Sequence, residues 1–262
     1  MKDKLFCLFL LITLSSEAGV LYQFSGIVVK EDGPERCLIF EAGPRNFVRQ
    51  TCIYPKNPNY LIFNYQKVFL GSLLLEPNPK SALMVGLGGG SFPNSLIQIF
   101  PNLDFDIVEI SPTVYEVAKK YFNFTPSKTT HVHIEDGVGF VSKSVKKYDL
   151  IFLDAFSAKD VAPEFLDKDF FQSLRNISNG VVVCNTFVRS KYFKKIDQLF
   201  KTFFKNAYSI TLAGNRIIIA SNHSIDLANL DKGPWDKVFE EHGVDPSWIL
   251  NLYEKAKPLS FR

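Results

Sequence analysis

The sequence predicts an α/β fold in which a mostly parallel sheet of seven strands follows a small antiparallel β-domain. Between residues 81 and 184, largely apolar runs alternate with helical segments, which is typical of a parallel sheet buried on both faces. The last two strand runs are separated only by residues 213–215, too few for a parallel crossover, so this pair is antiparallel. Before residue 63 the chain consists of short β-rich runs divided by turn-forming residues.

The N-terminal part is expected to form the small sheet. Its strand runs span 26–30, 37–41 and 47–53, and the turn sequences EDGP and EAGP separate them. A helix over about 63–75 follows, and it ends before the PNP sequence at 77–79, where neither proline can continue a helix.

The main sheet is built from alternating strands and helices. Its parallel strands are expected at 82–85, 105–108, 131–134, 150–153 and 180–184. The connecting helices are expected near 93–100, 112–121, 138–143 and 167–174. The remaining elements are a helix at 190–204, the antiparallel strands 208–212 and 216–220, and two short helices near 235–242 and 246–255. Parallel strands followed by a terminal hairpin form the layout of the Rossmann-like, AdoMet-dependent transferase fold.

The first residues have the pattern of a secretory signal peptide. A charged start and an apolar run at 5–14 precede the small residues Ser16 and Ala18, which lie just before Gly19. The apolar run is too short to span a bilayer. The alternative is a first helix docked on the domain, although the run has no polar face. We expect cleavage after residue 18 and export to the periplasm or beyond; an uncleaved chain would be cytoplasmic.

The chain is therefore expected to contain four segments. These are a signal peptide at 1–18, a β-hairpin domain at 19–62, a Rossmann-like nucleotide-binding domain at 63–225 and a helical tail at 226–262.

Composition excludes some classes of function. A net charge of +3 and the absence of long basic runs give no indication of nucleic-acid binding. Without the signal peptide, Cys37, Cys52 and Cys184 remain, an odd number with no C-x-x-C sequence, which argues against a zinc site. Cys37 and Cys52 could pair across a hairpin in an exported protein, or both could be buried thiols.

A glycine-rich loop at 86–90 follows the first parallel strand and begins a helix. Glycines at this point let the backbone turn tightly and approach a ligand closely. A structural glycine turn would explain the loop alone nearly as well. The chain has no G-x-x-x-x-G-K-[ST] sequence, which argues against a nucleoside triphosphatase.

Carboxylates follow the next three parallel strands. Glu109 ends the second strand, about twenty residues after the first glycine, where a carboxylate can accept both hydrogens of a ribose diol. Asp136 follows the third strand and Asp154 follows the fourth. Because ligands bind at the carboxyl ends of strands in open α/β sheets, we expect a nucleoside site at this edge.

In these residues the chain resembles the spermidine synthases, or polyamine aminopropyltransferases, over about residues 20–221. The most specific matches are FNYQ at 63–66, PNPK at 77–80, GLGGG at 86–90, VEI at 108–110, EDG at 135–137 and YDLIFLD at 148–154. The resemblance implies that Glu109 binds the ribose of the donor, Asp136 faces its adenine and Asp154 acts near the attacking amine. It assigns catalytic roles to Asp154 and Tyr65. The residues it assigns to donor binding are Gln66, Gly86, Gly88, Gly90, Glu109, Asp136 and Gly137.

The chain also departs from the family pattern. Gly89 stands where these enzymes carry an aspartate that helps to hold the donor, and Ser157 replaces a second aspartate after the fourth strand. In the same comparison, Ser25 stands in place of a glutamine of the first hairpin and Thr211 in place of an amine-site tyrosine. A cleft with fewer carboxylates attracts polyamines less strongly, so the nucleoside half of the site is expected to be intact and the acceptor half altered.

Three hypotheses for function follow. The first is transfer of an aminopropyl group from decarboxylated S-adenosylmethionine to an amine or polyamine, without a metal. The second is a methyltransferase that uses S-adenosylmethionine (AdoMet), whose carboxylate an acid at position 89 would repel. The third is a nucleoside-binding homologue without turnover. The fold alone does not choose among them. A homodimer through the N-terminal β-domain is a possible assembly.

Overall fold

The computed structural model describes residues 19–43, 46–155, 160–231 and 233–260. This part of the chain forms a four-stranded antiparallel sheet and, after it, an eight-stranded, mostly parallel sheet. The expected signal peptide at 1–18 lies outside the described residues. Within the described ranges, no helix has the length and apolar character needed to cross a bilayer.

The N-terminal sheet has the strand order β1-β2-β3-β4. Its strands are β1 (Gly19–Phe24), β2 (Ile27–Asp32), β3 (Glu35–Gly43) and β4 (Asn46–Ile53). The last three correspond to the strands predicted from the sequence, and β1 is an additional edge strand. Val20 and Phe24 of β1 are exposed, so this strand lacks the apolar alternation by which a half-buried strand is recognised.

The main sheet has the order β12-β10-β11-β9-β8-β5-β6-β7. Its parallel strands are β5 (Ser81–Val85), β6 (Asp104–Glu109), β7 (Thr130–Ile134), β8 (Tyr148–Leu153) and β9 (Ser178–Phe187). Its antiparallel strands are β10 (Asn206–Thr211), β11 (Asn215–Ser221) and β12 (Lys257–Pro258). The mostly parallel sheet and its antiparallel hairpin are confirmed. The sheet has one strand more than the predicted seven, because the two residues of β12 pair with β10 and are too few to show a periodic pattern.

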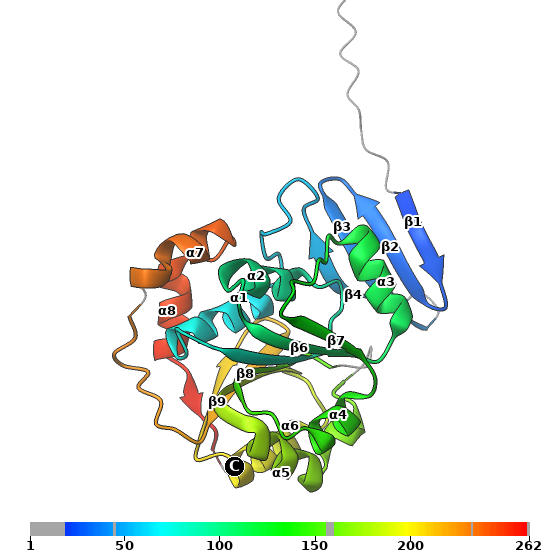
Figure 1. Cartoon of the computed structure of the whole chain (residues 1–262). Helices are drawn as coiled ribbons and strands as arrows, with labels where there is room; N and C mark the ends of the chain where they lie inside the picture. The colour runs from blue at the N-terminus through cyan, green and yellow to red at the C-terminus, as the bar shows by residue number, and fades with distance from the viewer. Residues whose placement is uncertain (1–18, 44–45, 156–159, 232, 261–262) are drawn as a thin grey trace, which may run out of the picture.

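Helices cover both faces of the main sheet (Figure 1). They are α1 (Asn64–Leu70), α2 (Ser91–Ile99), α3 (Pro112–Tyr121), α4 (Gly137–Lys143), α5 (Lys168–Ile177), α6 (Phe193–Phe203), α7 (Asp236–Glu241) and α8 (Pro246–Glu254), with 3-10 turns η1 (Gly71–Leu74), η2 (Pro163–Leu166) and η3 (Gly233–Trp235). Alternate residues of β5 enter opposite cores: Ala82 and Met84 face the core with α1, α2 and α8, whereas Leu83 and Val85 face the core with α5 and α6. Burial on both faces explains the continuous apolar runs of these strands.

The helix predicted over 63–75 is divided into α1 and η1 at Gly71. A Cβ at Gly71 would lie 2.6 Å from the Tyr253 ring and 2.7 Å from Ile249, so α8 packs closely here. The Tyr253 hydroxyl donates a hydrogen bond to the Val68 carbonyl at 2.7 Å. The C-terminal residues, described above as a tail, are therefore part of the core of the main domain.

The N-terminal sheet packs against α3, as Figure 1 shows. Val29, Leu38 and Ile53 from this sheet form one buried cluster with Val114 and Val117 of α3. This contact fixes the position of β4 beside the carboxyl ends of the parallel strands.

A disulfide bond joins β3 to β4. Cys37 and Cys52 face each other in the antiparallel register and are bonded, which decides between the two alternatives that the sequence left open. Glu35 lies near both sulfurs and completes a group of possible metal ligands, but the disulfide occupies the sulfurs. Cys184 is a buried free thiol.

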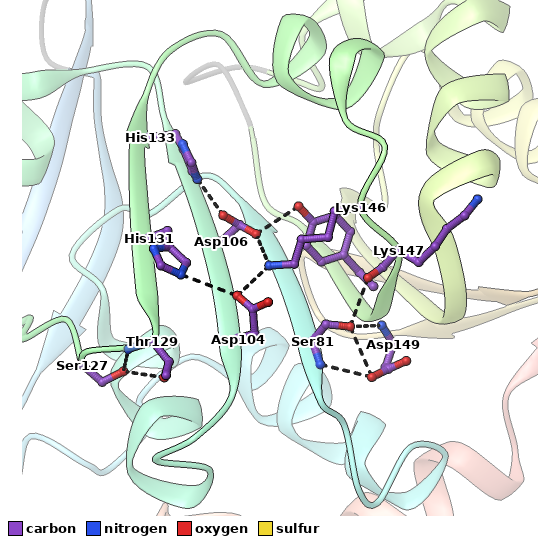
Figure 2. A network of polar contacts seen from close by, with 11 residues as sticks. Ser81, Asp104, Asp106, Ser127, Thr129, His131, His133, Lys146, Lys147 and Asp149 are labelled. Carbon is purple, nitrogen blue, oxygen red and sulfur yellow. Dashed lines mark hydrogen bonds and ion pairs between the residues drawn. The ribbon is translucent and has the colours of Figure 1, made fainter.

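A polar network connects the starts of β6, β7 and β8 on one face of the sheet (Figure 2). The Lys146 ammonium lies 2.6 Å from carboxylate oxygens of both Asp104 and Asp106. His133 lies 2.6 Å from the other oxygen of Asp106, and the Tyr148 hydroxyl donates to Asp106 at 3.0 Å. The buried Asp106 carboxylate therefore has three partners, from three different segments.

Candidate nucleoside and amine site

A cavity of about 900 Å³ opens at the carboxyl ends of the parallel strands, between the main sheet and β4. All but one of the predicted site residues line it, namely Tyr65, Gln66, Gly86, Gly88, Glu109, Asp136, Gly137 and Asp154. Gly90 does not line it. Gly90 is the left-handed residue before α2, with φ +75°, and a Cβ there would lie 2.7 Å from the Phe124 ring. Gly90 therefore permits the left-handed turn before α2 and the close packing of the Phe124 ring.

The glycine loop permits two close approaches. Gly86 has φ +95°, and a Cβ there would lie 2.5 Å from the carbonyl oxygen of Asp154. A larger residue at position 86 would therefore push apart the ends of β5 and β8. Gly89 donates its N–H to the Thr51 hydroxyl at 2.9 Å, and a Cβ at Gly89 would lie 2.8 Å from Thr51 Cγ2. Thr51 thus occupies the space beside position 89, where the family pattern has an aspartate.

Glu109 is held rigidly at the end of β6. One carboxylate oxygen accepts the Leu87 N–H at 3.0 Å and the other accepts the Ser111 N–H at 2.9 Å. The side chain is 7 % exposed. Burial raises the pKa of Glu109, and the hydrogen bonds from the backbone partly offset this rise. Each oxygen keeps lone pairs that can accept a hydroxyl hydrogen from a ligand.

Asp136 and Gly137 lie at the start of α4. The Asp136 carboxylate caps this helix by accepting the Gly139 N–H at 2.8 Å, and its side chain is exposed toward the cavity. A Cβ at Gly137 would lie 2.5 Å from Val85 and 3.3 Å from the Phe165 ring. Because Gly137 has no side chain, Val85 and Phe165 can both line the cavity at this point.

Asp154 lies at the centre of a polar chain. The Asn185 amide donates to Asp154 Oδ1 at 2.9 Å, and the Tyr65 hydroxyl interacts with the same carboxylate. Burial raises the pKa of Asp154 to about 7, and the hydrogen bonds from Asn185 and Tyr65 moderate that rise. Burial, together with the negative charge of Asp154, raises the pKa of Tyr65 well above its ordinary value. At neutral pH, Tyr65 is therefore a hydrogen-bond donor, while Asp154 can both give and take a proton.

Gln66 lines the cavity and carries a buried acceptor. Its amide nitrogen donates to the Ser91 hydroxyl at 3.0 Å, whereas its carbonyl oxygen is buried without a hydrogen-bond partner. A buried acceptor without a partner is costly, and a ligand N–H or O–H could satisfy it. Gln66 therefore fits a polar part of a bound nucleoside donor.

Strand β4 supplies lining residues that the sequence analysis did not identify, Arg49, Gln50 and Thr51. Ser25, taken above as the replacement for a glutamine, lies in the β1–β2 turn and does not line the cavity. The glutamine of the N-terminal sheet that lines the cavity is Gln50. Thr211 also lies outside the wall, where the neighbouring Leu212 takes part. Only the packing of the N-terminal sheet on α3 brings β4 to the cavity, so no local pattern could reveal these residues.

The loop after β8 is only partly described. Ser157, which replaces a family aspartate, lies outside the described residues. The next acid along the chain, Asp160, accepts hydrogen bonds from the Ser190 hydroxyl at 2.6 Å and from the Lys191 N–H at 3.1 Å. Asp160 thus anchors the start of the segment that leads to α6 and does not line the cavity.

Comparisons with known proteins agree with this site. Residues 63–215 match the family model described as the spermine/spermidine synthase domain. A polyamine aminopropyltransferase of Vibrio vulnificus is 36 % identical over 217 residues, which cover 79 % of this chain and 72 % of that enzyme.

Two solved structures are similar as well. A spermidine synthase in complex with the transition-state analogue AdoDATO has a TM-score of 0.67 at 19 % identity, covering 89 % of this chain and 84 % of that one. Human methyltransferase-like protein 13 in complex with SAH has a TM-score of 0.54 at 28 % identity, covering 76 % of this chain and 92 % of that one. The family match, the Vibrio relative and the shared fold lead to one conclusion: the chain is a transferase that belongs to the spermine/spermidine synthase family.

Proposed function

We propose that the protein transfers an aminopropyl group from decarboxylated AdoMet to a small amine or polyamine. The observation that carries this proposal is the Asp154 carboxylate, which lines the cavity, accepts a hydrogen bond from Asn185, interacts with Tyr65 and has a pKa of about 7. Aminopropyl transfer needs such a group, because an amine must lose a proton before or while it attacks.

The donor half of the cavity supports the same proposal. Glu109 presents two oriented oxygens that fit a ribose diol, and Gly86 and Gly88 allow a close approach of the backbone. Asp136 and Gly137 lie beside the Phe165 ring, which offers a flat apolar wall for a base. The structures that resemble this one include complexes with an AdoMet product and with a transition-state analogue.

In the proposed reaction, one bond to the aminopropyl carbon forms as another breaks, and Asp154 accepts the released proton. The amine nitrogen forms a bond to the aminopropyl carbon that is attached to the donor sulfonium. The bond between this carbon and sulfur breaks, its electron pair stays on sulfur, and methylthioadenosine leaves. Asp154 takes the proton that the nitrogen loses, and the Tyr65 hydroxyl favours the ionised carboxylate that accepts it.

The test is a product assay with purified protein. Putrescine, spermidine and a longer diamine are each offered with decarboxylated AdoMet and, separately, with AdoMet. Release of methylthioadenosine together with an aminopropylated amine is the expected result. If no amine is converted while methylthioadenosine still binds, the third hypothesis, a nucleoside-binding homologue, replaces the proposal.

Methyl transfer from AdoMet is the second candidate, and the contact between Gly89 and Thr51 favours it. With Thr51 beside position 89, this part of the site carries no acid to repel the AdoMet carboxylate. In the same assay, methyl transfer releases S-adenosylhomocysteine from AdoMet, so the nucleoside product distinguishes the two reactions.

We further propose that the protein is exported and that residues 1–18 are its signal peptide. The Cys37–Cys52 disulfide supports an oxidising compartment, since disulfides are rare in reducing cytosol. Intact-mass measurement of protein made in its native host should give a chain that starts at Gly19. A mature chain that still contains residues 5–14 contradicts the proposal.

A further inference from the structure

Asn185 connects the reacting carboxylate to the antiparallel part of the sheet. It lies near the end of β9, its side chain is 3 % exposed, and it lines the cavity beside Asp154. Its amide nitrogen donates to Asp154 Oδ1 at 2.9 Å, and its carbonyl oxygen accepts the Asn215 amide at 2.9 Å.

Neighbouring strands fix the direction of this chain of amides. In the antiparallel register of β9 and β11, Asn185 pairs with Ile217 and Asn215 pairs with Phe187, so the two asparagines are diagonal neighbours on one face. Because Asn215 donates to the Asn185 carbonyl, the Asn185 NH₂ group must point toward Asp154. The β10–β11 hairpin thereby determines which end of the Asn185 amide meets the carboxylate.

We propose that Asn185 is a positioning residue for Asp154, with Asn215 holding the Asn185 amide in its donating orientation. This inference rests on the proposed role of Asp154 as proton acceptor. A donated hydrogen bond favours the charged form of a carboxylate, whereas burial favours the neutral form. Asn185 therefore fixes the rotation of the Asp154 side chain and helps to keep it ionised.

Tyr65 also favours the ionised form of Asp154, but Asn185 contributes more to it. Tyr65 from α1 and Cys184 from β9 interact electrostatically with Asp154, and burial raises the pKa of each, so both are neutral near pH 7. Arg216 of β11 interacts with Cys184, and its guanidinium is paired with Asp197 at 2.6 Å.

The test compares Asn185→Ala, Asn215→Ala and the control Asn251→Ala, which changes an exposed residue of α8. Loss of a hydrogen bond to a charged group changes an equilibrium or rate constant roughly tenfold or more. We expect Asn185→Ala to lower kcat at pH 7 by about that factor and to move the rising limb of the kcat/KM profile by about one pH unit toward alkaline pH. Asn215→Ala should act in the same direction with a smaller shift, and methylthioadenosine affinity should stay within about twofold in all three variants.

A titration that needs no turnover completes the test. The carboxyl ¹³C signal of Asp154, assigned with Asp154→Asn, should titrate at higher pH in Asn185→Ala than in wild type. An unchanged Asp154 titration overturns the inference, even if activity falls. If Asp154 titrates as expected and no amine is converted by wild type, the proposed function fails while the interaction between Asn185 and Asp154 stands.

Discussion

At the scale of single residues, Asp154 has an unusual combination of properties for a surface-cavity carboxylate. It lines the cavity and can reach a bound ligand, yet burial among the surrounding residues raises its pKa to about 7, far above the ordinary range of aspartate. A base with a pKa near the working pH combines a useful ionised fraction with a strong tendency to accept a proton.

Asp154→Asn should therefore lower kcat by about 10²–10⁴-fold, the usual contribution of a positioned acid–base group. In the wild type, the carboxylate is ionised only above its pKa, so kcat/KM should rise as the pH increases through about 7. The variant should lose this rising limb and keep its affinity for methylthioadenosine. Steady-state kinetics from pH 5 to 9, with calorimetry for binding, are the measurements. A variant as active as wild type would exclude Asp154 as the base.

Glu109 gives a second prediction at this scale. In Glu109→Gln, one end of the side chain becomes an NH₂ group that faces a backbone N–H of Leu87 or Ser111, and one acceptor for the ribose is lost. Affinity for methylthioadenosine should fall about tenfold or more. Asp136→Ala should weaken binding in the same direction. Isothermal titration of both variants tests this, and unchanged affinity in both would mean that the nucleoside lies elsewhere.

At the scale of elements, the structure differs from the sequence prediction where contacts between elements decide the outcome. The helix predicted over 63–75 is divided at Gly71, because α8 approaches too closely for a Cβ. Strands β6, β7 and β8 are connected by a charge network around the buried Asp106 that no periodic pattern indicates (Figure 2).

The network around Asp106 makes a prediction about stability. Burial by itself would raise the pKa of Asp106, but hydrogen bonds from Lys146, His133 and Tyr148 outweigh it and lower the pKa below the ordinary value. A lowered folded-state pKa stabilises the fold above the unfolded pKa of about 3.9, and this contribution is lost as the pH falls through the folded-state pKa. Asp106→Asn should therefore reduce stability at pH 7 by about 1–3 kcal/mol.

The measurement for this variant is the difference in Tm between wild type and Asp106→Asn at several pH values. The difference should be largest near neutral pH and should shrink as the pH falls below the unfolded-state pKa of about 3.9. A difference that does not change with pH would show that packing, and not the charge of Asp106, is responsible.

At the scale of the whole molecule, the C-terminal residues complete the core of the main domain. Trp235, Phe239, Ile249 and Tyr253 are buried in the same cluster as α1 and α2. Four such side chains contribute roughly 6–12 kcal/mol, at about 1.5–3 kcal/mol each, which is comparable to the total stability of a domain.

A chain that ends at residue 225 should therefore lose its cooperative thermal transition. Circular dichroism during heating is the measurement, and a chain that lacks only residues 1–18 is the matched control. If the shortened chain unfolds cooperatively at the temperature of the control, the C-terminal residues are a separate appendage.

Much of the site could be predicted because its residues follow strands. Apolar runs locate the parallel strands, and the carboxyl ends of parallel strands share one edge, so Glu109, Asp136 and Asp154 had to meet there with the glycine loop. The same local patterns placed the turns and most of the helices. Asn185 also follows an apolar run, at 180–184, and could have been recognised by the same argument.

The sequence by itself determined which residues follow the parallel strands and so share this edge, because periodicity and turn residues act within about ten neighbouring positions. Only the tertiary structure decided that β4 closes the cavity, that Thr51 takes the space beside Gly89, and that Asn215 orients Asn185 toward Asp154. These contacts join segments that are 30 or more residues apart in the chain, as the separations of 38 between Thr51 and Gly89 and 30 between Asn185 and Asn215 show. Their geometry depends on how the elements pack, and no local pattern carries that information.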